Sequence, residues 1–340
     1  MSDFRIDQIT NRDGTSGTQI AGISTFSGTG GMQLPSGPTE YRGERGRGVI
    51  YGGSSPSDYQ KAINYITIAT TGSVIDFGDP HAKNGFSSGM GSSTRGIFKI
   101  GRGPGFNGRI DYVTFSSGGG IAEFGEDNGI QQDSCASFAD STRGCWGNGT
   151  GYDKKIQYIT MASTGDSTEF GELTGGRYQG GGSGGASPTR GFVFGGLSQP
   201  GVGLNPLGEK VIDYVTIQSK GNAVKFGELT VGRRAIAAVT NSTRAVACSG
   251  DTPGTSTMDY ITMASEGNAV TFGDITRQPS GYGAGMSNST RGVIAGCDTS
   301  PKDSIDYITF STTGNATDFG DTTYDSYLCG ACSDSHGGLG

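Results

Sequence analysis

The sequence has little of what most catalytic sites require. Its 340 residues include only two histidines and six cysteines, and charged residues make up 17%. A copper-radical site needs two His together with Tyr and Cys at the axis, whereas His81 lies in an expected loop and His336 at the last turn. We expect both histidines to be solvated rather than members of a nucleophilic triad. Cys329 and Cys332 are three residues apart on an expected strand, so they should face opposite sides and be buried small residues rather than zinc ligands. We therefore expect no catalytic residue, no metal and no cofactor.

The chain also lacks a positive charge excess and long hydrophobic runs. Its formal net charge is −7, so the cationic surface of a nucleic-acid-binding protein is absent. There is no run of about 18 apolar residues, which predicts no membrane span. The first residues, Met1 to Arg5, lack the apolar stretch of a secretory signal, which predicts synthesis in a cytoplasm.

What the chain has in abundance is glycine, with 64 residues, together with 14 tyrosines and 16 phenylalanines. Glycine costs about 1 kcal/mol per helix position relative to alanine, so a helical bundle is disfavoured. Glycine does not recur at every third residue, which excludes collagen. The composition predicts an all-β protein of short strands and tight turns.

An aromatic pair, Tyr and then Phe twelve residues later, recurs six times along the chain. Each Phe is followed by Gly and then by an acid, and an Arg recurs upstream of each pair. The pairs are Tyr65 and Phe77, Tyr112 and Phe124, Tyr158 and Phe170, Tyr214 and Phe226, Tyr260 and Phe272, and Tyr307 and Phe319. The arginines are Arg47, Arg95, Arg143, Arg190, Arg244 and Arg291. Such a period indicates a repeat architecture.

Turn residues divide each repeat of about 47 residues into four short strands, which is typical of a propeller blade. The first strand is made of small residues, as expected where blades crowd at the axis. We predict a six-bladed β-propeller of four-stranded antiparallel blades over residues 46–340. The C-terminal segment 326–333 should complete blade one beside residues 47–53. A seven-bladed ring and an open arc remain the alternatives.

Short turns should form one face of this propeller and the variable loops the other. We expect the repeated Arg and Phe residues to be structural, with each Arg bonding turn carbonyls. Blade four has an enlarged loop, in which the candidate binding residues are Gln199, Leu204, Asn205 and Leu207. A tolerated surface insertion is the alternative.

Residues 1–45 do not repeat and are too few to bury a core alone. We interpret them as a strand-rich arm that docks on another chain or on copies of itself. The candidate docking residues are Phe4, Ile6, Ile9, Ile20, Phe26 and Met32. Packing of the arm on its own propeller is the alternative.

Two resemblances accompany these patterns. The Gly-rich first strand, the second strand at 190–196 and the Asp-Tyr third strand resemble a kelch blade, although Phe replaces Trp in the fourth strand. The arm phrases at 9–15, 22–28 and 34–43 look like the N-terminus of virion structural proteins of marine cyanophages.

The second resemblance implies a non-enzymatic, tail-associated virion protein that is present in several copies per particle. Its propeller would adsorb to host-surface glycan or link tail components, and its arm would dock to other virion proteins. A carbohydrate-active enzyme on a propeller is the alternative function. That function would need clustered carboxylates, whereas the repeated acids are distributed one per blade.

Overall fold

The computed structural model describes residues 46–55, 58–103, 108–117, 119–128, 133, 135–149, 151–178, 184–198, 208–277, 281–296 and 302–335. Every regular element within these ranges is a β-strand. None of the described segments forms a helix that could cross a membrane. Residues 44–340 form one compact unit, and the docking-arm residues 1–45 lie outside the described ranges.

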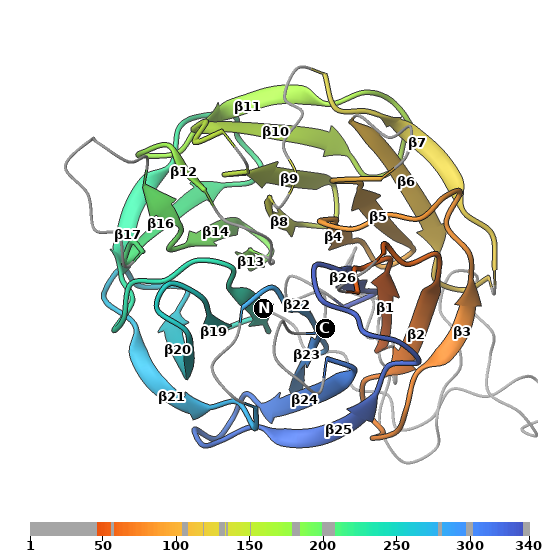
Figure 1. Ribbon diagram of the computed structural model, residues 1–340. Helices are drawn as coiled ribbons and strands as arrows, with labels where there is room; N and C mark the ends of the chain where they lie inside the picture. The colour runs from red at the N-terminus through yellow and green to blue at the C-terminus, as the bar shows by residue number, and fades with distance from the viewer. Residues whose placement is uncertain are drawn as a thin grey trace, which may run out of the picture. The chain divides into compact units, whose positions relative to one another are not determined.

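Six four-stranded antiparallel blades surround one axis, which confirms the predicted six-bladed propeller (Figure 1). Within a blade the strands are called A to D from the axis outward. Blades one to three comprise β26 (Gly330–Ser333), β1 (Arg47–Tyr51), β2 (Ile63–Thr67) and β3 (Ile75–Gly78); β4 (Ser88–Gly91), β5 (Arg95–Lys99), β6 (Arg109–Thr114) and β7 (Ala122–Glu126); and β8 (Ala136–Ala139), β9 (Arg143–Gly147), β10 (Lys155–Thr160) and β11 (Thr168–Glu172).

Blades four to six repeat the order, and one further pair of short strands, β12 and β15, lies outside the blades. They comprise β13 (Gly185–Ala186), β14 (Arg190–Phe194), β16 (Val211–Thr216) and β17 (Val224–Glu228); β18 (Ala237–Thr240), β19 (Arg244–Gly250), β20 (Thr255–Thr262) and β21 (Val270–Asp274); and β22 (Ala284–Ser287), β23 (Arg291–Ala295), β24 (Ser304–Thr309) and β25 (Thr317–Asp321). The additional pair is β12 (Arg177–Tyr178) and β15 (Leu197–Ser198).

The ring closes in blade one, where β26 pairs with β1 as predicted. Asp334 donates its backbone N–H to the Arg47 carbonyl at 3.2 Å, and the Arg47 N–H donates to the Asp334 carboxylate at 3.1 Å. Asn288 and Arg291 make the same two bonds in the covalently continuous A–B turn of blade six, at 2.9 and 2.7 Å. The closure therefore reproduces an ordinary A–B turn without a chain connection, which excludes the seven-bladed ring and the open arc.

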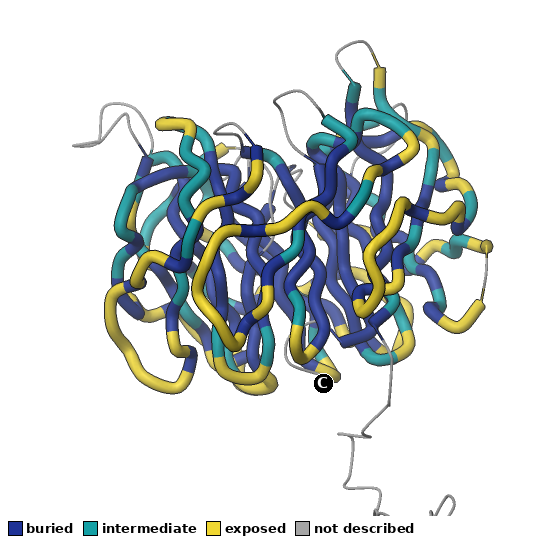
Figure 2. Tube along the Cα trace, turned by 90° about the horizontal axis from the view of Figure 1, so that it is seen from below, coloured by how far each residue is buried: buried dark blue, intermediate teal, exposed yellow. Residues whose placement is uncertain are grey.

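The innermost strands are buried along their described lengths, as Figure 2 shows. They also bond to one another across blades. The Ser287 hydroxyl donates to the Thr240 carbonyl at 2.7 Å, and the Ser333 hydroxyl donates to the Ser287 carbonyl at 2.6 Å. A Cβ on Gly285 would lie 2.8 Å from the Ala238 carbonyl carbon. Small residues are therefore required at the axis, as the sequence indicated.

The hydrophobic core is divided into six clusters, each shared by two neighbouring blades. In every blade the repeated Tyr and Phe meet edge to face, with ring centroids 5.7–6.1 Å apart. A β-bulge between strands C and D accompanies each pair. The bulge turns the Phe inward. Phe77 is 4% exposed, whereas Ile75 on the same strand is 53% exposed.

In five blades the Arg of strand B is followed by a glycine that packs against a strand A side chain from the preceding blade. A Cβ on Gly292 would lie 2.5 Å from Cγ2 of Val239. Blade five has Ala245 at this position, and there the preceding strand A supplies Gly185, whose own Cβ would lie 3.3 Å from the Ala245 Cβ. The two positions therefore compensate in volume across the blade interface.

The glycine that follows each repeated Phe is required for a different reason. A Cβ on Gly227 would lie 2.5 Å from the carbonyl carbon of Gly267, in the C–D turn of the next blade. That turn bonds the outer strand, because the N–H of Gly267 donates to the Phe226 carbonyl at 3.1 Å. The Phe-Gly motif thus allows each blade to cover part of its neighbour's outer strand.

Candidate functional site

The six repeated arginines join neighbouring blades. Arg291 of blade six donates to the Ala69 carbonyl in the C–D turn of blade one at 2.8 Å, and its guanidinium lies 4.8 Å from the Tyr307 ring centroid. Arg47, Arg95, Arg143, Arg190 and Arg244 make the same pair of contacts. In each case the bonded turn carbonyl belongs to the next blade.

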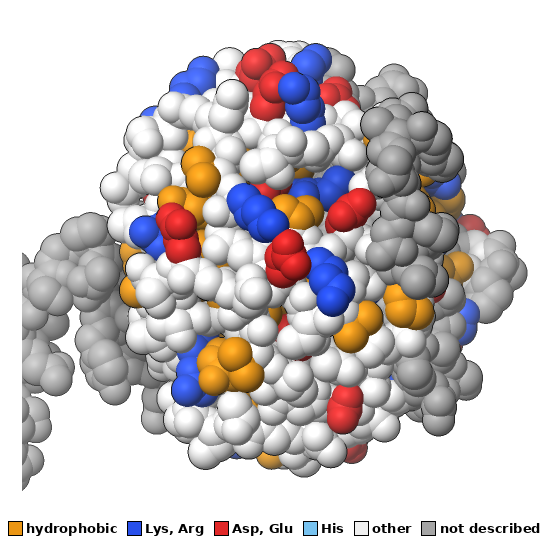
Figure 3. Space-filling view, turned by 90° about the vertical axis from the view of Figure 1, so that its left-hand side faces the viewer, with side chains coloured by type: hydrophobic (Ala, Val, Ile, Leu, Met, Phe, Trp, Pro, Cys, Tyr) orange, Lys and Arg blue, Asp and Glu red, His pale blue; other side chains and the backbone are white. Residues whose placement is uncertain are grey.

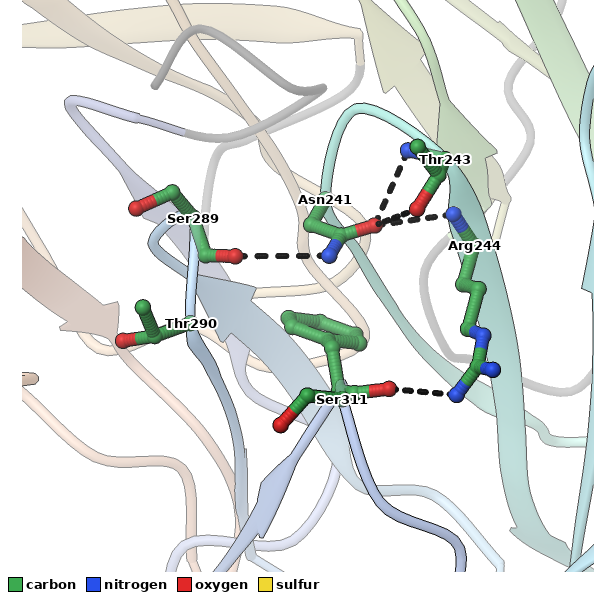
Figure 4. A pocket seen from close by; sticks show the side chains of 7 residues that line it. Asn241, Thr243, Arg244, Ser289, Thr290 and Ser311 are labelled. Carbon is green, nitrogen blue, oxygen red and sulfur yellow. Dashed lines mark hydrogen bonds between the residues drawn. The ribbon is translucent and has the colours of Figure 1, made fainter.

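A polar groove of about 290 Å³ lies beside one of these arginines, between blades five and six on the A–B turn face (Figure 4). Asn241 accepts hydrogen bonds from the backbone of Thr243 and Arg244 and donates to the Ser289 carbonyl at 3.3 Å. Arg244 donates to the Phe310 carbonyl. These polar groups mainly hold the turn and the blade interface together.

Three buried arginines, which the sequence reasoning missed, connect the D–A linkers before blades four, five and six to strand C of the following blade. The side chains of Arg233 and Asp259 are both 0% exposed, and Nη1 lies 2.9 Å from Oδ2. The Thr230 hydroxyl donates to the same carboxylate at 2.7 Å. The equivalent ion pairs are Arg177–Asp213 and Arg277–Asp306. A signal was present, because a Thr lies three residues before Arg177 and Arg233 and directly before Arg277. An Asp also directly precedes the repeated Tyr of each partner blade.

The opposite face carries aromatic and charged side chains around the axis, where the D–A linkers enter the inner strands. Arg234 lies between two tyrosines, 5.1 Å from the Tyr178 ring centroid and 6.0 Å from that of Tyr282. Asp251 binds the guanidinium at 2.9 Å and also accepts from the Tyr282 hydroxyl at 3.3 Å. The Tyr152 and Tyr178 rings are 6.2 Å apart. This row of side chains spans blades three to six.

A second set of contacts continues around the same face in blades one to three. Arg102 lies 4.5 Å from the Phe86 ring centroid and forms an ion pair with Asp133. The Tyr59 ring meets Phe86 edge to face, with centroids 6.5 Å apart. Burial raises the pKa of Tyr178, and the charges of Arg234, Asp133 and Arg102 also act on it. Charged groups of both sets therefore act on the Tyr178 hydroxyl.

We call Arg102, Asp133, Tyr178, Arg234, Asp251 and Tyr282 the mouth cluster.

The mouth cluster lies beside both ends of the enlarged blade-four loop. Tyr178 pairs with Leu197 in the sheet of β12 and β15, immediately before that loop. After the loop, a Cβ on Gly208 would lie 2.8 Å from the Thr252 carbonyl oxygen. The predicted binding residues Gln199, Leu204, Asn205 and Leu207 lie outside the described ranges, as do all six docking-arm residues.

The described part of the chain holds few side chains suited to acid–base catalysis or metal binding. His81 is exposed, and no group of three or more His, Cys, Asp or Glu side chains there could hold a metal ion. Burial alone would raise the pKa of Asp251, but hydrogen bonding and charge from Arg234 outweigh it and leave the pKa below its ordinary value. Cys329 and Cys332 are buried and belong to different core clusters, which agrees with the expectation that they face opposite sides of their strand.

Among the described residues, the outer rim carries small apolar groups. Figure 3 shows acidic and basic side chains interspersed on the side that carries β17, with hydrophobic side chains in small groups. Val224 and Val270 are exposed there, at 54% and 57%. Lys225 and Glu228 form an exposed ion pair at 2.7 Å. The mouth cluster is therefore the strongest candidate site.

The chain matches no model of a known protein family, and no curated protein is similar enough in sequence to count as a relative.

Proposed function

We propose that this chain is a non-enzymatic structural protein of a phage particle, associated with the tail. Residues 1–45 dock it to other virion proteins, and the propeller adsorbs to the host surface. The likeness of the arm to marine cyanophage virion proteins supports the assignment to a phage particle. The arrangement of the propeller supports separate roles for the arm, which attaches, and the propeller, which binds.

The proposal of separate roles for the arm and the propeller rests on one observation. Gly46 and Ser335, the first and last described residues, both lie at the A–B turn of blade one. The mouth cluster and both ends of the enlarged loop lie at the opposite face. Attachment through the part of the chain that precedes Gly46 would therefore leave the opposite face available for a ligand.

The chemistry of that face supports binding rather than hydrolysis. Glycoside hydrolysis uses two carboxyl groups, one of which is protonated. The mouth carboxylates, Asp133 and Asp251, are each paired with an arginine. The lowered pKa of Asp251 keeps it ionised at neutral pH, so it is a poor proton donor.

The test uses the full-length chain with a fluorescent label. It should bind marine cyanobacterial cells saturably and slow phage adsorption to them, and it should not bind an unrelated bacterium. Immunogold labelling with an antibody to the propeller should mark the tails of intact particles. If no host strain binds the protein and the label appears only on disrupted tails, the adsorption role is wrong and a linking role between tail components replaces it.

A further inference from the structure

We infer that the mouth cluster is the ligand site of the propeller and that its ligand is a neutral saccharide. This inference rests on the proposed adsorption function and names the chemistry of its partner. The two faces of the propeller differ in their side chains. The A–B turn face has short turns of Ser, Thr and Asn, whereas the opposite face has aromatic rings and charged groups where the linkers reach the axis.

The cluster is preorganised. Arg234 is held by Asp251 through both Nε and Nη2, at 3.2 and 2.9 Å, and by the two tyrosine rings. The backbones of Arg234 and Asp251 also form a two-bond bridge, with N–O distances of 2.9 and 2.8 Å. A ligand would therefore meet side chains that are already ordered, which lowers the entropy cost of binding.

Aromatic residues occupy the mouth although the backbone disfavours them. Phe86 and Tyr282 adopt φ values of +57° and +71°, a region that is costly for bulky residues. Ala235 and Leu328 share this conformation before their own inner strands, so the conformation belongs to the linker. Glycine would fit it best, whereas the rings at Phe86 and Tyr282 pack on the guanidinium groups of Arg102 and Arg234. Both rings are half-buried, so part of each faces solvent.

The charge and hydrogen-bonding groups define the ligand class. Two arginines are matched by two aspartates, so the cluster has no net charge. Nucleic acid requires unmatched cations. Tyrosine faces accept the C–H faces of sugar rings, while guanidinium, carboxylate and phenol groups bond neighbouring hydroxyls. A neutral sugar presents both kinds of surface without a charge that the site would have to balance.

The test combines cell binding with a glycan array that carries neutral oligosaccharides of glucose, galactose, mannose and fucose, and acidic oligosaccharides that contain uronic acids. The full-length chain should bind neutral members. Tyr178→Ala and Tyr282→Asn should each weaken binding at least tenfold, because Asn tolerates the positive φ and removes the ring. Arg234→Lys keeps the charge but loses the planar, forked geometry, and should weaken binding severalfold.

Two variants away from the mouth serve as controls, Val270→Ala on the rim and Gln218→Ala on the A–B turn face. Both should bind within twofold of the parent. Thermal unfolding of every variant separates lost binding from lost folding, and only variants that unfold with the parent's cooperativity are compared.

The outcomes separate this inference from the adsorption function. Cell binding that survives in all folded mouth variants refutes the site and leaves adsorption intact. If the mouth variants lose cell binding but neutral sugars do not compete with binding of the parent chain, the ligand is not a neutral saccharide. A saccharide ligand is also refuted if protease treatment of the cells abolishes binding of the parent chain. Preferential binding of acidic sugars also refutes it. A parent chain that binds no cells refutes the proposed function itself.

Discussion

Substitution of Gly292 by alanine tests the volume compensation between blades. Alanine is normally favoured over glycine within a strand by about 0.5–1 kcal/mol. Here the new Cβ would lie 2.5 Å from Cγ2 and 2.8 Å from Cβ of Val239, and 3.1 Å from Cζ of Phe310. Val239 is β-branched and fully buried, so its side chain cannot rotate away. We expect Gly292→Ala to destabilise the protein by about 1–3 kcal/mol, as overpacked cores do.

The natural pair Gly185 and Ala245 provides the rescue. Val239→Gly alone should cost about 3 kcal/mol, from lost burial and added backbone freedom. Combined with Gly292→Ala it recreates the pair found between blades four and five. The double variant should therefore be more stable than the sum of the single effects by about 1–3 kcal/mol.

Urea unfolding followed by circular dichroism and by the fluorescence of the single tryptophan, Trp146, measures these free energies. Coincident transitions would justify a two-state treatment. Gly221→Ala is the matched control, because its Cβ would meet nothing within 4 Å, and it should change stability by less than about 0.5 kcal/mol. A neutral or stabilising Gly292→Ala, or strictly additive effects, would refute the reasoning.

Three further predictions concern the closure, the arginines and the thiols. Removal of residues 325–340 deletes β26 and should abolish folding, whereas Asp334→Ala should cost only about 1 kcal/mol, the value of one hydrogen bond; a stable truncated monomer in size-exclusion chromatography would contradict this closure. Arg291→Met should destabilise the protein by about 1–3 kcal/mol, because the bond to the Ala69 carbonyl and the contact with the Tyr307 ring are lost. Urea unfolding measures this change, and an unchanged midpoint would show that Arg291 does not stabilise the blade interface. Burial raises the pKa of Cys135 to about 12 and also raises the pKa values of Cys145, Cys248 and Cys332. The folded state keeps these protons where the unfolded chain loses them, so the free energy of unfolding should fall as pH rises above about 8.5, by up to about 1.4 kcal/mol per pH unit for each thiol. Urea midpoints between pH 7.5 and 10 measure this fall, Cys248→Ala should reduce its slope, and a pH-independent midpoint would contradict it.

The blade architecture could be predicted from sequence because each of its requirements recurs in phase. The Tyr–Phe spacing, the small inner strands and the turn residues repeat six times, and the C-terminal segment matches the one inner strand that the N-terminal half lacks. The partners of these residues were less visible. Arg291 bonds Ala69 more than two hundred residues away, which only the closed ring brings about.

The mouth cluster could not be predicted, because it does not follow the repeat. Tyr178 and Arg234 occupy equivalent places, each directly after a buried arginine, yet they are different residues. Asp251 comes from a B–C loop and Tyr282 from the linker of the next blade. Linkers and loops of different blades come together only at the axis, so their proximity in space cannot be read from the spacing of residues along the sequence. Both ends of the enlarged loop lie beside the mouth cluster, but its candidate residues, like the docking arm, lie outside the described ranges.

The direction of strand β1 has a mechanical consequence. β1 starts at the A–B turn face with Arg47 and ends near the opposite face with Tyr51, and it is paired on both sides, with β26 and β2. A pull between an anchored arm and a ligand held at the mouth would act along this strand. Interstrand hydrogen bonds lie across the strand direction, so such a load shears all of them together rather than opening them one at a time. Anchored at Gly46, the propeller would therefore resist being dragged from a surface better than its modest apolar content suggests.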